Sequence, residues 1–203
     1  MSPRPRKVSD EEVFAAAQRA MSRLGPADLT LSAIAAEAGV TAGALVQRFG
    51  SKRELQVALS AAAAGSTRGF IDALQKQHRS PLAALRAYSA CLAGLASSPA
   101  ALSRNLAYLQ IDLTDPDLRK HLLTQARATR AGLRRLIAAA IEAGEVSRKA
   151  DPARLARVVD TTLGGSMMSW ACYREGTAAR WMRKDLDAVL APYVTKPRES
   201  RRE

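Results

Sequence analysis

The sequence predicts an all-α protein, and three features of its 203 residues indicate this fold class. Alanine and leucine dominate the chain, and β-branched residues are few. No segment alternates apolar and polar residues with the period of a strand. Ser or Asp directly precedes Pro at positions 80–81, 98–99, 115–116 and 151–152, as at many helix starts. We expect a three-helix N-terminal helix-turn-helix part followed by roughly six helices.

The first helix is expected to begin just after Ser9. Ser9 and Glu12 have the spacing of a capping box, in which each side chain accepts a hydrogen bond from the other residue's backbone N–H. The helix runs to about Leu24, because Gly25 and Pro26 follow and end it.

Residues 30–49 predict two short helices joined by a tight turn. Ile34 and Ala38 are four residues apart, and so are Leu45 and Phe49, so each helix has one apolar stripe to pack on the other. Gly39 ends the first of these helices, because glycine adopts the left-handed conformation without a Cβ penalty. Thr41 then caps the second helix.

Small residues follow this cap, and they predict a function for the helix pair. Ala42, Gly43 and Ala44 let the backbone at a helix N-terminus come close to base edges and phosphates. We therefore interpret the pair as a helix-turn-helix that reads duplex DNA.

With the helix before it, this segment resembles the DNA-binding part of the TetR/AcrR transcriptional regulators over roughly a quarter of the chain. The resemblance implies that the first three helices bind DNA and that the helical remainder binds a small molecule and dimerises. Val46 departs from the pattern, since most members have a tyrosine there that contacts a phosphate. The residues that carry the resemblance are Thr30, Gly39, Val40, Thr41, Gly43, Leu45, Phe49, Ser51, Lys52 and Leu55.

Direct reading of bases is expected from Gln47, because its amide can pair with an adenine edge, while Arg48 and Lys52 hold phosphates. Residues 2–7 are basic, and they are either a solvated terminus or an arm that reaches the DNA backbone or minor groove. The residues predicted to bind DNA are Thr30, Ser32, Thr41, Ala42, Gly43, Ala44, Gln47, Arg48 and Lys52.

A long connecting helix follows the DNA-binding part. Ser51 and Glu54 form a second capping box, and the helix reaches about Gln77. We place the domain boundary here, with the arm and helix-turn-helix in residues 1–53 and the regulatory domain in residues 54–203. Gly144 and Gly176 are expected to end the helices that begin after Asp115 and Asp151, and Thr177 to begin a last helix to about Tyr193.

The helices beginning at residues 81, 99 and 116 are expected to enclose an effector site. Polar side chains on their apolar stripes need a partner, which is either a ligand, an internal hydrogen bond or solvent. For Arg130 a salt bridge to an acid on a neighbouring helix competes with a ligand carboxylate or phosphate. The residues predicted to contact the effector are Tyr88, Leu92, Leu106, Leu109, Leu122, Gln125, Thr129 and Arg130.

Two nearly opposite stripes of apolar or small residues mark the helix over residues 151–175, and the last helix has one. Such a pair is either a central core element or half of a four-helix dimer interface, and the resemblance favours the dimer. The predicted interface residues are Gly164, Gly165, Met168, Cys172, Met182, Leu186 and Leu190.

Several classes of protein lack support in the sequence. Cys91 and Cys172 are too few for a disulfide framework or a metal site, which fits a reducing cytoplasm. No nucleophile motif or phosphate loop is found, and no apolar run is long enough for a membrane span. We expect neither an enzyme nor a cofactor. The net charge of +12 favours an anionic partner, but most of the excess lies beyond residue 53.

We therefore expect a cytoplasmic homodimer that binds a pseudo-palindromic DNA operator as a repressor and is released by a small-molecule effector. The sequence leaves two alternatives open. One is an architectural or nucleoid DNA-binding protein that needs no ligand, and the other is a helical ligand-binding protein with weakened DNA binding.

Overall fold

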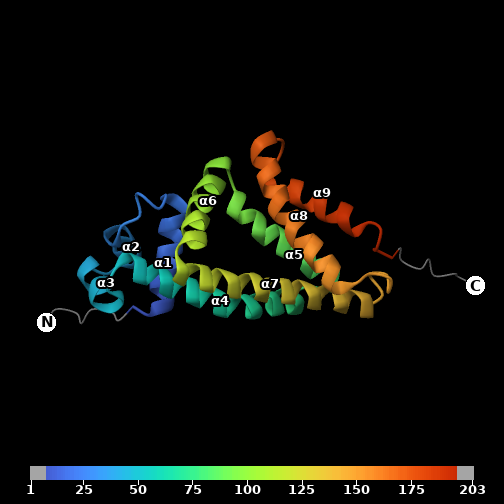
Figure 1. The fold of residues 1–203 in the computed structure, drawn as a ribbon, viewed down its shortest axis with the longest axis horizontal. Coiled ribbons are helices and arrows are strands. Elements are labelled where there is room, and N and C mark those ends of the chain that lie inside the picture. The colour runs from blue at the N-terminus through green and yellow to red at the C-terminus, as the bar shows by residue number, and fades with distance from the viewer. Residues whose placement is uncertain (1–7, 196–203) are drawn as a thin grey trace, which may run out of the picture. The chain divides into compact units, whose positions relative to one another are not determined.

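The structure is a computed structural model that describes residues 8–195, so the basic segment expected as an arm, residues 2–7, lies outside the described residues. The all-α prediction is confirmed for the described range, which holds nine α-helices, one short 3₁₀ turn and no strand (Figure 1). The helices are α1 (Asp10–Arg23), α2 (Leu31–Ala38), α3 (Ala42–Phe49), α4 (Lys52–Gln77), α5 (Pro81–Ala93), α6 (Pro99–Thr114), α7 (Pro116–Glu142), α8 (Pro152–Tyr173) and α9 (Ala178–Leu190).

Most of the expected helix ends are confirmed. Ser9 and Glu12 form the capping box at α1, and Gly39 ends α2 in the left-handed region with φ +69°. Two ends differ from the prediction. Arg174, with φ +57°, ends α8 two residues before Gly176, and α9 ends at Leu190 rather than Tyr193. The side chains that cap helix starts include those of Ser9, Thr30, Thr41, Ser51, Ser80, Asp115, Asp151 and Thr177.

The chain packs into two compact units. Unit 1 comprises residues 1–64 and 100–123, and unit 2 comprises residues 65–99 and 124–203. Helices α4 and α7 each begin in unit 1 and continue into unit 2. The expected boundary at residue 53 separates helices by role, whereas packing also assigns the first half of α4, nearly all of α6 and the first turns of α7 to unit 1.

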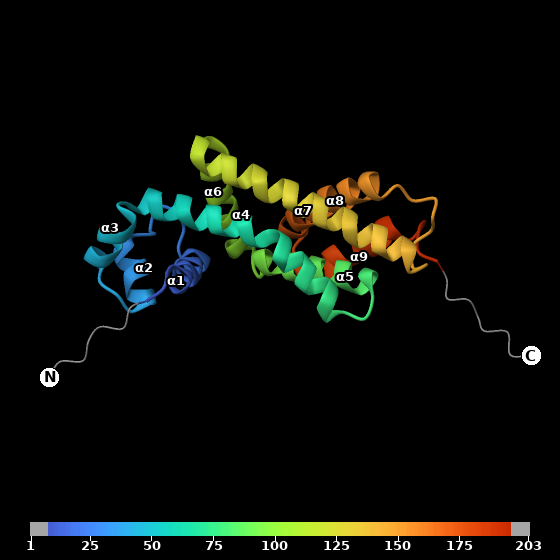
Figure 2. The same ribbon diagram turned by 90° about the horizontal axis from the view of Figure 1, so that it is seen from below.

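Unit 1 has its own apolar core. Helices α1, α2 and α3 lie against one another (Figure 2), and Val13, Ile34 and Leu45 are buried between them. Helix α6 joins this core through Tyr108, whose hydroxyl donates a hydrogen bond of 2.8 Å to the Leu24 carbonyl. The end of α1 is thereby held to the middle of α6.

Unit 2 is built around the pair α8 and α9, which lie side by side (Figure 1), with α5 packed on α9. The Ser166 hydroxyl donates to the Asp185 carboxylate at 2.7 Å and links the two helices. Helices α4 and α7 meet in this unit, where the Ile71 side chain of α4 packs on the backbone of Gly132 in α7. This contact leaves no room for a Cβ at residue 132. The largest fully buried side chains of unit 2 are Ile71, Leu85, Leu133, Leu136, Ile137, Leu163 and Met182.

We predict that Gly132→Ala destabilises the protein by about 1–3 kcal/mol through overpacking. An added Cβ would clash with the Cδ1 of Ile71 and lie 3.1 and 3.3 Å from its Cγ2 and Cβ, so the clash is not confined to the flexible end of that side chain. Gly65→Ala, at an exposed position of α4, is the control, since nothing lies within 4 Å of its added Cβ. The control should stabilise the helix by about 0.5–1 kcal/mol in urea denaturation. Equal effects of both variants would contradict the close α4–α7 contact.

Candidate nucleic-acid interface

The N-terminal part of the exposed face of α3 is small and uncharged, and Arg48 follows in its last turn. Thr41 caps the helix by accepting a hydrogen bond of 3.1 Å from the backbone N–H of Ala44, and Leu45 turns inward to the core. The predicted residues Gly43, Ala44 and Gln47 are exposed, while Ala42 is half-buried against the core of unit 1. Gln47 is therefore the exposed amide side chain beside methyls, a hydroxyl and backbone groups.

Hydroxyl groups mark the start of α2 as they do that of α3. Thr30 accepts a hydrogen bond of 3.0 Å from the backbone N–H of Ala33, and Ser32 is exposed in the first turn. The first N–H groups of a helix attract anions because they have no partner within the helix. Both short helices therefore offer a phosphate backbone N–H groups and hydroxyls.

Lys52, which we expected to contact a phosphate, is engaged within the protein, and its phosphate contact stays a prediction. Its ammonium group is partly buried and donates to the carbonyl oxygens of Leu29 at 2.8 Å and Pro26 at 3.2 Å. These carbonyls belong to the loop between α1 and α2, so Lys52 ties the first turn of α4 to that loop. The local sequence gives no sign of this contact, because Pro26 and Leu29 lie 26 and 23 residues before Lys52 in the chain.

Arg48 is also engaged within unit 1. Its guanidinium donates to the Val8 carbonyl at 2.6 Å, pairs with the Asp10 carboxylate and lies over the Phe49 ring, 5.4 Å from the ring centre. We expected Arg48 to hold a phosphate. In this structure it fastens the start of α1 to the end of α3.

The remaining basic residues near the helix-turn-helix follow the same pattern. Glu37 of α2 accepts from Arg23 and from Arg19 of α1, and these two hydrogen bonds hold the pKa of its carboxyl below the ordinary value. Arg53 of α4 donates at 2.7 Å to each of Asp115 and Asp117 at the start of α7. Sequence reasoning identified Asp115 only as a helix cap and gave no sign of Arg53 as its partner.

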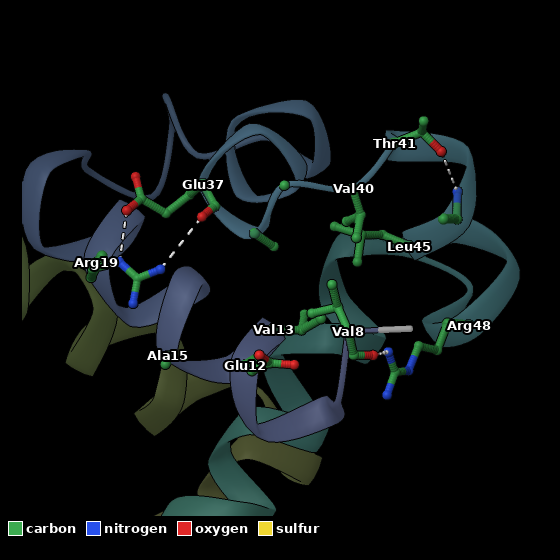
Figure 3. Close-up of a pocket in the computed structure, with 13 residues that line it drawn as sticks. Val8, Glu12, Val13, Ala15, Arg19, Glu37, Val40, Thr41, Leu45 and Arg48 are labelled. Atoms are coloured by element: carbon green, nitrogen blue, oxygen red, sulfur yellow. Dashed lines mark hydrogen bonds and ion pairs between the residues drawn. The ribbon is translucent and has the colours of Figure 1, made fainter. Parts of the chain in front are cut away.

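A groove lies between α1 and the turn from α2 to α3, with a volume of about 1280 Å³. Figure 3 shows Val13, Val40 and Leu45 along its apolar side, with the Arg19–Glu37 and Arg48–Val8 contacts at its edges. The Arg19, Glu37 and Arg48 side chains at these edges are thus already engaged within unit 1.

The expected effector residues divide between the two units. Leu106, Leu109 and Leu122 belong to unit 1, and Tyr88, Leu92, Gln125, Thr129 and Arg130 belong to unit 2. In unit 2, Tyr88 is buried beside Thr129, whereas Arg130 forms the alternative salt bridge, with 3.4 Å between its Nη2 and Oδ2 of Asp160.

Three of the expected dimer residues are core residues instead. Met182, Leu186 and Leu190 are 0% exposed within a single chain, because the apolar stripe of α9 packs on α8 and α5. A partner chain cannot reach them. On α8, by contrast, Gly165, Met168 and Cys172 are exposed and Gly164 is half-buried, so the interface expectation remains for that helix alone.

Other kinds of site were sought in residues 8–195. This range contains no group of three or more His, Cys, Asp or Glu side chains that could hold a metal ion. None of its helices combines the length and the apolar character needed to cross a membrane.

The fold and this interface define a helix-turn-helix DNA-binding protein, and comparison with known families gives the particular family. Residues 13–59 match the bacterial regulatory proteins of the tetR family, and residues 106–186 match the tetracyclin repressor-like C-terminal domain. The chain belongs to the TetR family of transcriptional regulators. No curated protein matches its sequence.

Solved structures share the fold at low sequence identity. A TetR transcription regulator from Haloarcula marismortui is 20% identical with a TM-score of 0.69, covering 92% of this chain and 98% of its own. SmeT, the repressor of the Stenotrophomonas maltophilia multidrug efflux pump SmeDEF, is 24% identical with a TM-score of 0.64, covering 94% and 92%. FadR from Bacillus subtilis, in complex with stearoyl-CoA, is 16% identical with a TM-score of 0.66, covering 90% and 98%.

We predict that Lys52→Met destabilises the protein by about 1–3 kcal/mol, because it leaves two backbone carbonyls without their charged donor. Urea denaturation measures this change. Arg119→Met, which removes an exposed cation from α7, is the control and should change stability by less than about 0.5 kcal/mol. Unchanged stability, together with a weaker salt dependence of DNA binding, would return Lys52 to the phosphate role.

Proposed function

We propose that this chain is a homodimeric transcriptional repressor of the cytoplasm that binds a pseudo-palindromic DNA operator and is released by a small-molecule effector. The observation that carries the proposal is the exposed face of α3, where small residues surround Gln47. Such a face fits the major groove closely and places one amide against base edges. Its function is binding rather than catalysis.

Release by an effector is supported by the neighbours' known roles and by the chain itself. SmeT is the repressor of an efflux pump, and FadR was solved with stearoyl-CoA. In this chain α4 and α7 run from unit 1 into unit 2 without a break. A ligand that binds one state of unit 2 more tightly therefore has a covalent path to the helix-turn-helix, and it can shift operator affinity by its differential affinity for the two states.

The dimer is supported by the exposed side of α8. Val158, Thr161, Gly165, Met168 and Cys172 recur at spacings of three and four residues, so they share one face of the helix. Val158 and Met168 are 40% and 47% exposed, although the opposite face of α8 is buried in the core. A self-complementary apolar face of this kind suits an isologous two-fold contact.

Base reading by Gln47 gives the first test of the proposal. Gln47→Ala should weaken binding to the operator by about 1–3 kcal/mol and leave binding to random duplex almost unchanged, because a bidentate contact to adenine discriminates between bases. Fluorescence anisotropy with the promoter region beside the protein's own gene and with a scrambled duplex measures both affinities. Gln75→Ala, an exposed amide on α4, is the matched control. Equal losses on both duplexes would remove Gln47 from base readout.

The dimer face is tested by charge. Met168→Arg should convert the dimer to monomers in analytical ultracentrifugation and weaken operator binding, since like charges would meet near the two-fold axis. Phe70→Arg is the control, because Phe70 is a similarly exposed apolar side chain on α4, 44% exposed. A Met168→Arg variant that remains dimeric with full operator affinity would show that α8 does not form the contact.

A further inference from the structure

A cluster of polar side chains joins three helices of unit 2. Tyr88 comes from α5, Thr129 and Arg130 from α7, and Asp160 from α8. Tyr88 is 8% exposed and lies beside Thr129 and Asp160, and Asp160 pairs with Arg130. Burial, with Asp160 nearby, raises the pKa of Tyr88 to about 12, so its hydroxyl keeps a proton to donate at neutral pH.

One edge of the core-facing stripe of α5 becomes accessible to solvent beyond this cluster, while Ser89 and Ala93 on its other edge, and Ala96 in the following turn, stay buried. Leu85 and Tyr88 are buried, Leu92 is half-buried, and Leu95 in the following turn is 46% exposed, although these positions share one helix face. An apolar surface of growing exposure thus leads away from the Tyr88 hydroxyl.

The stripe of α7 changes in the same way. Leu133 is fully buried, Thr129 one turn earlier is half-buried, and Gln125 and Ala126 one turn earlier still are exposed. Tyr88 and Thr129 therefore lie where the buried and the accessible parts of both stripes meet. Core positions that remain accessible are the places where an apolar ligand gains most by burial.

Positive charge surrounds the cluster. Arg127, Arg130 and Arg134 share one face of α7, and Arg157 precedes Asp160 by three residues on α8. In residues 8–195, neither Arg127, Arg134 nor Arg157 has an acidic partner, and the described part of unit 2 holds sixteen Lys and Arg against eight Asp and Glu. Asp160 thus pairs with Arg130, while Arg127, Arg134 and Arg157 lie within about a turn of this pair on the same two helices.

From this arrangement we propose that the Tyr88, Thr129, Arg130 and Asp160 cluster binds the anionic head group of an amphiphile, a carboxylate or phosphate carried by an apolar chain. The ligand replaces Asp160 as the partner of Arg130, accepts a hydrogen bond from Tyr88, and lays its chain along Leu92 and Ala126. The proposal deepens the proposed function and rests on it only in calling this ligand the effector.

The ion pair in place is suited to such an exchange. Its two atoms are 3.4 Å apart, and the Arg130 side chain is 55% exposed. Exposed ion pairs contribute little to stability, so the loss of Asp160 as a partner is a small cost. A bidentate carboxylate on the planar guanidinium makes two parallel charge-assisted hydrogen bonds. A cationic ligand would instead compete with Arg130 for Asp160 and meet the charges of Arg127 and Arg134.

The experiment uses three probes of equal chain length, octanoate, octanol and octylammonium, with the full chain and no DNA. Calorimetry should show octanoate binding at least about tenfold more tightly than octanol and octylammonium. Arg130→Gln should weaken octanoate about tenfold without changing octanol, and Asp160→Asn should strengthen octanoate because it removes the competing carboxylate. Arg180→Gln, at an exposed position of α9, is the control and should bind octanoate as the wild type does. Circular dichroism melting shows that each variant is folded.

Several results would overturn the anion site. These are tighter binding of octylammonium, weaker octanoate binding in Asp160→Asn, unchanged octanoate binding in Arg130→Gln, or no binding of octanoate at millimolar concentration. The proposed function fails separately. If octanoate binds as expected but leaves operator affinity unchanged, the anion site stands but is not the effector site. If another ligand releases the operator and octanoate does not bind, the regulator stands and the anion site is wrong.

Discussion

The first turn of α4 holds unit 1 together, and the rest of the DNA-binding structure depends on it. Lys52 binds two carbonyls of the loop between α1 and α2, and Arg53 forks onto Asp115 and Asp117 at the start of α7. The two neighbouring side chains thus fasten α4 both to the helix-turn-helix and to the helix that accompanies it into unit 2. In unit 2 the same two helices are joined again, by Arg135 with Asp72 at 2.8 Å and by Ile71 against Gly132.

This use of cations limits how unit 1 attracts DNA. Arg19, Arg23 and Arg48 are paired with acids, and the Lys52 ammonium donates to carbonyls, so all four groups are already engaged within the unit. Residues 8–64 and 100–123 hold eight Lys and Arg against nine Asp and Glu. Sequence-independent affinity for DNA comes chiefly from unbalanced positive charge near the phosphates. Within the first 64 residues, the basic residues other than these four and Arg53 are Arg4, Arg6 and Lys7, which lie outside the described range.

Local chemistry made much of the fold predictable. Capping residues before proline, the Ser9–Glu12 box and Gly39 each act within a few residues, so the starts and ends of most helices could be read from the sequence. The small, neutral start of the α3 face followed from the same local reading. The partners of Lys52 and Arg53 could not be read, because 23 or more residues separate each pair and nothing local marks them.

Amphipathic stripes were ambiguous for a related reason. The stripe of Met182, Leu186 and Leu190 shows that α9 buries one face, but a partner chain and the chain's own α8 would leave the same pattern. For Arg130, likewise, helical position placed the side chain beside an apolar stripe, and only the fold brought Asp160 to it. Long-range packing determines both the surface that covers the α9 stripe and the partner of Arg130. Such packing is the feature that a single sequence indicates least directly.

We infer that Arg19, Arg23, Arg48 and Lys52 stabilise unit 1 itself, and we propose that the basic residues 2–7, which lie outside the described residues, supply the attraction to phosphates. The salt dependence of binding to a random duplex tests it most directly, measured for the full chain and for residues 8–203. Each phosphate contact contributes about 0.9 to the slope of log affinity against log salt, so loss of three cations should lower the slope by about 2–3 per chain. Equal slopes for the two proteins would contradict the claim and place the phosphate contacts on the side chains of unit 1.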